Sequence, residues 1–205
     1  MSASEESNVG NFGSETNNLY GVIDKHNVHG LNLTVPEDAK AVIKPWDERE
    51  DTEKYADSNV DDQVILHIPF TQNVRLRSIS LKLGRGELAP RHLRIYANHT
   101  TIVDFEDAEV TKAQLNITLQ EGEVGAVEYP LNTPAFANIH SLSVFFSEAV
   151  GGEVTRLYYI GFRGDTRTPR KEGRSKLEIP AANAADASLA DRLQEKTGGQ
   201  QTTAR

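Results

Sequence analysis

The middle of the chain alternates apolar and polar side chains in the manner of β-strands. From residue 64 the sequence reads VILHIPF, in which Val64, Leu66, Ile68 and Phe70 share one parity. Successive side chains of a strand point to opposite faces, so this segment presents one wholly apolar face. Pro69 lacks a backbone donor, and we therefore expect the strand to lie at a sheet edge or to end there.

The next segment, NVRLRSISLKL, changes parity within its own length. Val74 and Leu76 fall on one parity, whereas Ile79, Leu81 and Leu83 fall on the other. A slip of one residue turns every later side chain to the opposite face. The pattern therefore predicts a β-bulge or a crossing between two sheets.

Further short strands are predicted along the second half of the chain, separated by Gly, Pro and Asn residues that are typical of turns. They are LRIYA, QLNITL, AVEYPL, SLSVFFS and TRLYYIGFRG. No helical stretch is long enough to connect parallel strands. We predict an all-β fold, an antiparallel β-sandwich or barrel of about eight strands. The one helix candidate is 184–196, where two leucines four residues apart make a weak apolar stripe.

Both ends of the chain are poor in apolar residues and cannot bury enough surface to offset the loss of chain entropy. We expect a disordered N-terminal tail at 1–18 and a flexible or partly helical C-terminal tail at 181–205. The interpretation leaves one β-sandwich domain at 19–180.

Charge and cysteine content narrow the functional classes. The net charge is −8, from 30 acidic and 22 basic residues, and a field of that sign opposes nucleic acid and anionic membranes. Cysteine is absent, which excludes disulfides, thiol nucleophiles and thiolate metal sites. With no apolar run of membrane-spanning length and no signal sequence, we expect a cytoplasmic and nuclear protein.

Catalytic and metal motifs are weak. His26 and His29 could supply two zinc ligands, but nothing nearby completes a set of four. The acidic stretch DFEDAE could hold calcium, or it could be a charged connection whose Phe105 enters the core. No nucleophile elbow or nucleotide-binding loop is present, although carboxylate pairs that converge only in space stay open. We expect a protein that is not an enzyme and that needs no cofactor or metal.

The stretch VIKPWDERED holds the only tryptophan, Trp46, between Pro45 and a run of charged residues. Two interpretations stay open. The indole ring could cap an open end of the sandwich, with Pro45 fixing its entry angle, or it could be an exposed binding anchor. If the ring is buried, we expect its charged neighbours Lys44 and Arg49 to make the contacts with a partner instead.

The segment 163–176 is locally basic within an acidic protein and includes an Arg-Gly-Asp triplet. It follows an aromatic strand, so an exposed tyrosine beside Arg156 or Arg163 would suit an interface with an acidic partner. A solvated strand exit is the alternative.

Several blocks resemble the PITH domain, a proteasome-interacting domain, and they occur in the same order: KPWDERED, SNVDDQ, VILHIPFTQNVRLRSI, DFEDAE and YYIGFRG. The resemblance is closer to stand-alone members than to those fused to a thioredoxin domain. It implies a jelly-roll β-sandwich of galactose-binding-like type that associates with the 26S proteasome regulatory particle. The thioredoxin domain and its Cys-x-x-Cys are absent, so disulfide reductase activity is not implied.

The working hypothesis is a non-enzymatic module that binds regulatory-particle subunits. The alternative, by analogy of fold, is a β-sandwich that binds a carbohydrate or another small ligand. The candidate partner-binding residues are Lys44, Trp46, Arg49, Asp61, Asp62, Arg156 and Arg163.

Overall fold

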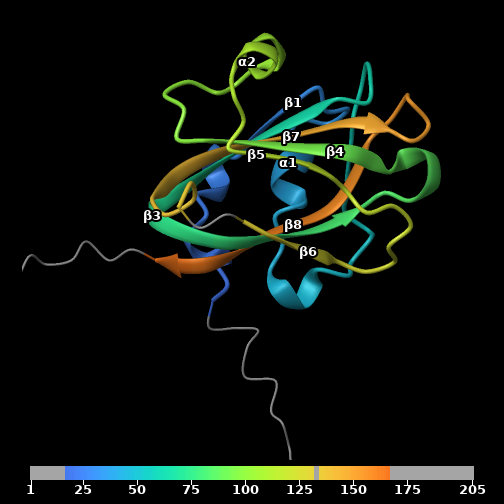
Figure 1. The fold of residues 1–205 in the computed structure, drawn as a ribbon. Coiled ribbons are helices and arrows are strands. Elements are labelled where there is room, and N and C mark those ends of the chain that lie inside the picture. Colours follow the sequence, from blue (N-terminus) through green and yellow to red (C-terminus); the bar gives the residue numbers. More distant parts are fainter. Residues whose placement is uncertain (1–16, 132–133, 167–205) are drawn as a thin grey trace, which may run out of the picture. The chain divides into compact units, whose positions relative to one another are not determined.

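Eight antiparallel strands form the framework of the computed structural model, which describes residues 17–131 and 134–166 (Figure 1). The strands are β1 (His29–Leu31), β2 (Ala56–Asp57), β3 (Val64–Leu83), β4 (Pro90–Ala97), β5 (Leu115–Thr118), β6 (Val127–Pro130), β7 (Ile139–Ala149) and β8 (Arg156–Thr166). Two short α-helices accompany them, α1 (Asp38–Ala41) and α2 (Phe105–Val110). Single 3₁₀ turns lie at η1 (Tyr20–Val22), η2 (Lys25–Asn27), η3 (Trp46–Glu48) and η4 (Gly86–Leu88).

Strand β3 belongs to both layers of the sandwich. Its first half pairs with β1 and β7, and its second half pairs with β8 and β6. One layer therefore runs β1-β3-β7-β4-β5 and the other β6-β3-β8-β2. The ladder with β8 shifts register between Leu76 and Ser78, at the predicted change of parity. This shift is the predicted β-bulge. The strand also passes between the two layers, but earlier, between Pro69 and Val74, where the ladder to β7 breaks. The two segments predicted as separate strands are one.

Pro69 corrects one expectation, because it lies inside a central strand rather than at an edge. Its neighbour across the ladder is Ser141 of β7. The missing donor is tolerated because pairing with β1 has already ended at His67, and because the ladder to β7 breaks between Pro69 and Val74. The carbonyl of Pro69 accepts a hydrogen bond from the backbone N–H of Asp24 at 2.9 Å.

The main core is built chiefly from apolar side chains of β3, β4, β7 and β8, to which the N-terminal segments and the loops add further apolar residues. A second, smaller cluster covers the outer face of the β7 layer, where Ile65, Tyr96 and Phe145 pack under α2. The ring of Phe105 meets that of Phe145 edge to face, with 5.9 Å between centroids. The Tyr96 hydroxyl donates to the Ala108 carbonyl at 2.8 Å.

The DFEDAE stretch forms helix α2 rather than a loop. Asp104 caps the helix, its carboxylate accepting from the backbone N–H of Asp107 at 2.8 Å. Phe105 is half-buried against the outer cluster, while Glu106 and Glu109 are exposed. The structure thus favours the charged connection with an inserted Phe105 over the calcium loop.

The sequence pattern missed the two shortest strands, β1 and β2, which have too few residues to show alternation. At the N-terminal side, Asn18 forms a β-bridge with Arg163, and Asn17 accepts from the backbone N–H of Gly164 at 2.8 Å. These two residues of the predicted tail are therefore attached to β8. The rest of that tail, the tail at 181–205 and the helix candidate at 184–196 lie outside the described residues.

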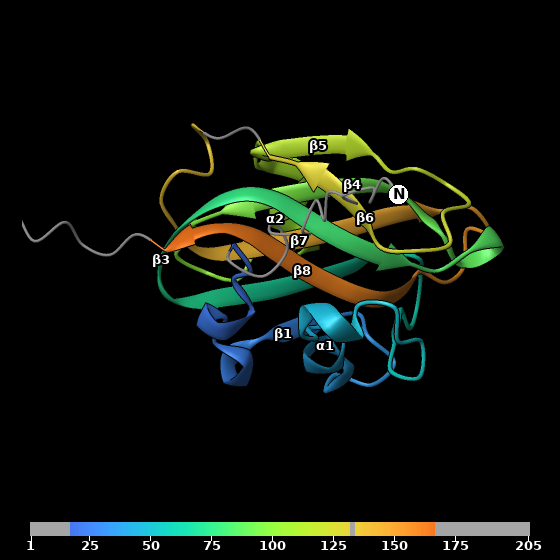
Figure 2. The same ribbon diagram turned by 90° about the horizontal axis from the view of Figure 1, so that it is seen from below.

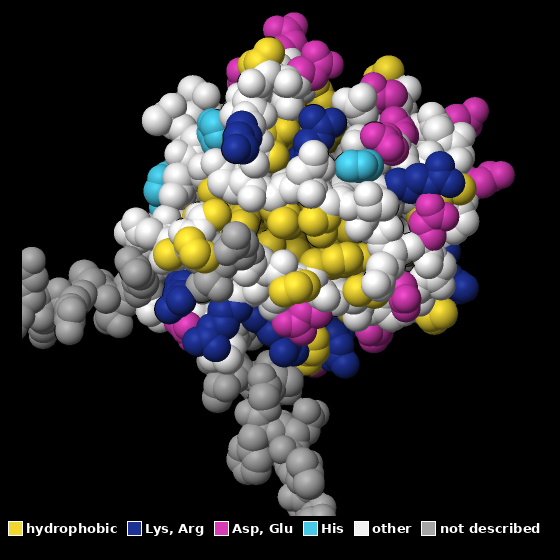
Figure 3. All heavy atoms as spheres, in the orientation of Figure 1, with side chains coloured by type: hydrophobic (Ala, Val, Ile, Leu, Met, Phe, Trp, Pro, Cys, Tyr) yellow, Lys and Arg dark blue, Asp and Glu magenta, His cyan; other side chains and the backbone are white. Residues whose placement is uncertain are grey.

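One edge strand of each layer, β5 in the first and β6 in the second, lies on the same side of the sandwich. Strands β5 and β6 each pair with a single neighbour, and Figure 2 shows them on one side of the sandwich, with α1 and β1 on the opposite side. Figure 3 shows apolar side chains gathered on the face where β5 and β6 lie, and Leu115, Ile117 and Val127 are partly buried there. No helix within the described ranges is long and apolar enough to span a membrane.

Candidate functional site

Trp46 is the centre of a cluster of cationic and aromatic side chains. Pro45 is extended, with φ −63° and ψ 162°, and it directs the chain into the single turn η3 that begins at Trp46. The guanidinium carbon of Arg49 lies 4.3 Å from the centroid of the indole ring, and that of Arg163, from β8, lies 4.1 Å away. We call Trp46, Arg49 and Arg163 the arginine–tryptophan cluster. It is assembled from two segments more than a hundred residues apart in sequence.

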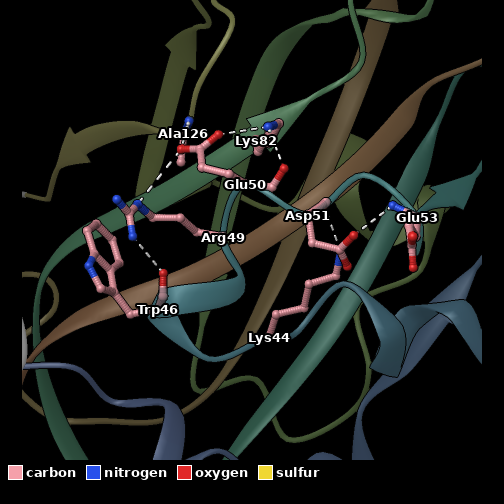
Figure 4. A network of polar contacts seen from close by, with 8 residues as sticks. All are labelled: Lys44, Trp46, Arg49, Glu50, Asp51, Glu53, Lys82 and Ala126. Carbon is pink, nitrogen blue, oxygen red and sulfur yellow. Dashed lines mark hydrogen bonds and ion pairs between the residues drawn. The ribbon is translucent and has the colours of Figure 1, made fainter.

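The Trp46 ring is half-buried, between the two arrangements that the sequence left open. Arg49 is held in place by a hydrogen bond from Nη1 to the Trp46 carbonyl at 2.9 Å (Figure 4). Such cation–π contacts contribute about 0.5–1 kcal/mol at exposed sites and about 2 kcal/mol when desolvated. Each arginine therefore restricts the ring, and the ring restricts each arginine.

The two arginines of the cluster are only loosely paired with acids. Arg163 lies 3.5 Å from a carboxylate oxygen of Glu128, and Arg49 lies 3.8 Å from one of Glu50. The Nε of Arg163 is buried and has no hydrogen-bond partner among the described residues. Charge-assisted hydrogen bonds to carboxylates are usually much shorter, about 2.7–2.9 Å. Because both ion pairs are long, the partly exposed guanidinium groups keep cationic donor capacity that an acidic group can use, although the buried Nε of Arg163 is not part of it.

Glu50 ties the loop after Trp46 to the sandwich (Figure 4). One of its carboxylate oxygens accepts from Lys82 Nζ at 2.7 Å, and the other accepts from the backbone N–H of Ala126 at 3.1 Å. The ammonium of Lys82 also donates to the Glu50 carbonyl at 2.9 Å. The hydrogen bond from Lys82 lowers the pKa of Glu50, although partial burial opposes it.

Lys44 lies inside the same loop and does not offer its ammonium to a partner. The side chain is 3% exposed, and Nζ donates to the carbonyls of Asp51 at 2.9 Å and Lys54 at 2.8 Å. It also lies 3.0 Å from the Asp51 carboxylate. The pKa of Asp51 is lowered by the hydrogen bond from the Glu53 backbone N–H and by Lys44. A buried ammonium needs such partners, so Lys44 stabilises the loop.

Asp61 and Asp62 lie in the turn before β3. The Asp61 carboxylate accepts from the side-chain amide of Asn32 at 2.6 Å and from the backbone N–H of Gln63 at 3.0 Å. The Asp62 carboxylate accepts from the backbone N–H of Ala149 at 2.6 Å. Within the described part of the chain, no hydrogen bond or ion pair joins either aspartate to the arginine–tryptophan cluster.

Arg156 belongs to a separate group, and the sequence did not point to its partners Asp57 and Tyr55. Its guanidinium forms a two-pronged contact with the Asp57 carboxylate, at 2.7 and 2.6 Å, and lies 4.1 Å from the centroid of Tyr55. The hydrogen bonds that the guanidinium donates to Asp57 raise the pKa of Arg156, although partial burial opposes them. The rings of Tyr55 and Tyr158 meet edge to face, 6.1 Å apart. Only contact across β2 and β8 brings these residues together.

Two motifs from the sequence remain, the Arg-Gly-Asp triplet and the possible metal ligands. Arg163, Gly164 and Asp165, the Arg-Gly-Asp triplet, lie within β8, and Asp165 pairs with Arg77 at 2.7 Å. Among the described residues, no group of three or more His, Asp or Glu side chains is placed to hold a metal ion.

Relatives of the chain share its domain. The PITH domain model matches residues 11–182. A PITH domain-containing protein of Drosophila melanogaster is 33% identical over 169 residues, 82% of this chain and 79% of that protein. PITH domain-containing protein 1 of Danio rerio is 35% identical over 82% of this chain and 80% of that protein. The Homo sapiens protein of the same name is 32% identical over 82% of this chain and 79% of its own length.

Solved structures share the fold at low identity. A family 32 carbohydrate-binding module of Clostridium perfringens, in complex with GalNAc-β-1,3-galactose, has a TM-score of 0.52 at 10% identity, covering 72% of this chain and 99% of that one. The family 32 module of C. perfringens NanJ, in complex with galactose, has a TM-score of 0.51 at 11% identity, covering 71% and 97%. This likeness shows a galactose-binding-like β-sandwich, the fold class expected from the sequence. With a domain model that matches most of its length and relatives of the same name at about one third identity, the chain belongs to the PITH domain family.

Proposed function

We propose that this PITH domain protein is a non-enzymatic interaction module that associates with the 26S proteasome regulatory particle, in the cytoplasm and nucleus. Membership of a proteasome-interacting family supports the choice of partner. The observation that supports the mode of binding is the arginine–tryptophan cluster, in which two guanidinium groups lie 4.3 and 4.1 Å from the centroid of one half-buried indole ring.

The cluster has the composition of a binding hot spot. Trp, Tyr and Arg are the residues most enriched where a few side chains carry most of the binding free energy. The arrangement also limits the entropy lost on binding, since Arg49 is already fixed by the Trp46 carbonyl and both arginines are in contact with the ring. With ion-pair distances of 3.5 and 3.8 Å inside the domain, both guanidinium groups retain hydrogen-bonding capacity for carboxylates of an acidic partner surface.

The other candidate residues take supporting parts in this proposal. Lys44 holds the loop that carries Trp46, with help from Glu50, which was not a candidate, and Asp61 and Asp62 hold the turn before β3. Arg156 orients Asp57 and Tyr55 at the other side of the same loop. The direct contacts are thereby reduced to Trp46, Arg49 and Arg163.

Sugar binding is not proposed, because identities of 10–11% to galactose-binding modules support the fold alone. Of the candidate residues from the sequence, Trp46 alone offers an aromatic face on which a sugar could stack. The Trp46 ring already has two guanidinium groups over it.

Affinity purification from native lysate tests the proposal, with the full chain as bait and regulatory-particle subunits quantified by mass spectrometry. The test variant combines Trp46→Ala with Arg163→Glu. The control is Arg85→Glu, an exposed arginine with no ion pair among the described residues. We expect regulatory-particle subunits to be enriched by the wild type and the control and lost in the double variant. Equal recovery with the double variant, when it unfolds at the same denaturant concentration as wild type, would refute this binding surface.

A further inference from the structure

A groove beside α1 lies next to the loop that carries Trp46 but is not part of the arginine–tryptophan cluster. It has a volume of about 340 Å³ and is open to solvent. Val35 and Asp38 line one side, and Glu53, Lys54, Tyr55 and Asp57 line the other. We call it the α1 groove.

Both walls of the α1 groove are fixed by hydrogen bonds. On one side, the backbone N–H of Thr34 donates to the Asp57 carbonyl at 2.9 Å, and its hydroxyl donates to the Ser58 carbonyl at 3.0 Å. On the other side, the buried Lys44 ammonium holds the Lys54 carbonyl at 2.8 Å. The groove is thus a preformed concavity, as binding sites for small groups generally are.

Apolar and aromatic surface is exposed at the rim. Val35 is 44% exposed and Tyr55 is 39% exposed. The Tyr55 ring is held by the Arg156 guanidinium, 4.1 Å from its centroid, and by the edge of Tyr158. An exposed but immobilised tyrosine loses little entropy when it packs against a ligand.

Acidic side chains outnumber basic ones in the lining of the groove. Asp57 is engaged by Arg156 at 2.7 and 2.6 Å, whereas Asp38 has no hydrogen bond or ion pair from its carboxylate among the described residues. Burial raises the pKa of Asp38, and the carboxylates of Glu37 and Asp57 raise it further. A cation placed beside Asp38 would relieve both effects. The groove's own cation, Lys54, makes no ion pair there in the described part of the chain.

We infer that the α1 groove binds a lysine or arginine side chain from an extended segment of a protein partner. The basic group pairs with the Asp38 carboxylate, and the apolar stem of the side chain lies along Val35 and Tyr55. Long basic side chains bury their methylene groups against such surfaces while the charged end finds its partner. This site therefore selects a basic segment, the opposite of the acidic surface proposed for the arginine–tryptophan cluster.

Titration of the isotope-labelled full chain by NMR tests the inference, with a blocked peptide of sequence Gly-Leu-Arg-Leu-Gly as the probe. We expect saturable shifts of the backbone amides of Val35, Asp38 and Tyr55. The same peptide with citrulline in place of arginine should bind about tenfold more weakly, as loss of one charged hydrogen bond implies. Asp38→Asn should weaken binding of the arginine peptide by a similar factor. The control Glu109→Gln, at an exposed position on α2, should leave the affinity unchanged.

Three results would overturn the inference: no shifts at these amides, equal binding of the citrulline peptide, or unchanged affinity in Asp38→Asn. If a second copy of the chain fills the groove instead, sedimentation shows a dimer that Asp38→Asn dissociates, and the peptide does not bind. The measurement contains no proteasome, so its outcome is independent of the proposed function.

Discussion

Replacing the buried Lys44 by methionine should destabilise the domain and loosen the loop that carries Trp46. The methionine keeps most of the apolar stem and the volume, so little cavity is created. What is lost is the ammonium, which donates to the Asp51 carbonyl at 2.9 Å and the Lys54 carbonyl at 2.8 Å. No other side chain among the described residues donates to these two carbonyls.

The magnitude follows from those two hydrogen bonds. A hydrogen bond from a charged donor contributes about 1.5–3 kcal/mol. Because Asp51 is half-buried and Lys54 is exposed, water can reach their carbonyls after the substitution. Each lost hydrogen bond therefore costs about 1.5 kcal/mol, the lower end of this range. The expected loss is about 3 kcal/mol of unfolding free energy, or roughly 6–12 °C in melting temperature for a domain of this size.

Urea unfolding of the full chain, followed by tryptophan fluorescence, measures this loss. Lys112→Met is the control, since Lys112 is exposed and should change the unfolding free energy by less than about 0.5 kcal/mol. Hydrogen exchange should also become faster at the Glu53 amide, which donates to Asp51 at 2.8 Å. If Lys44→Met is as stable as Lys112→Met, the assignment of Lys44 as the support of this loop is wrong.

Two further predictions concern β3 and its neighbours. Gly164→Ala should cost more than about 2 kcal/mol of unfolding free energy, because the added methyl group would overlap the backbone carbonyl of Arg75. Gly21→Ala is the control, since the added methyl group there meets open space. Equal stability of the two variants in chemical denaturation would contradict this prediction. Because the pKa of Glu50 is lowered in the folded state, its contribution to the unfolding free energy is fully present above the ordinary glutamate pKa. That contribution is lost as the pH falls through the folded-state pKa. The difference in unfolding free energy between wild type and Lys82→Met should therefore shrink on acidification from neutral pH, and a constant difference would contradict the pairing.

The sheet was largely predictable because alternation is a local property of the sequence. The four strands that supply most of the main core have eight or more residues, and the parity change within β3 marked the β-bulge between Leu76 and Ser78. Strands β1 and β2, with three and two residues, carry no such signal. Helix α2 had a readable start in Asp104, an N-cap residue, but its acidic composition suggested a loop.

The candidate site was predictable only in part. Trp46 stands out in the sequence because it is the single tryptophan, and Arg49 follows one helical turn later. That Arg163 completes the cluster depends on the register of β8, which no local pattern reveals. Lys44 reads as a surface cation between Ile43 and Pro45, yet the fold of the loop buries it.

The residues that the sequence missed act through contacts between distant segments. Lys82 reaches Glu50 and Asp57 reaches Arg156 across the folded sheet. Each is an ordinary charged residue in its local sequence. Their roles become visible only when burial and partner distances are known.

The most direct test of the proposed function is equilibrium binding of the labelled full chain to purified 26S proteasome and, in parallel, to the isolated proteolytic core particle. We expect saturable binding to the 26S proteasome, none to the core particle, and at least about tenfold weaker binding of the Trp46→Ala, Arg163→Glu variant. Absence of binding to the 26S proteasome, or equal affinity of the folded double variant, would contradict it.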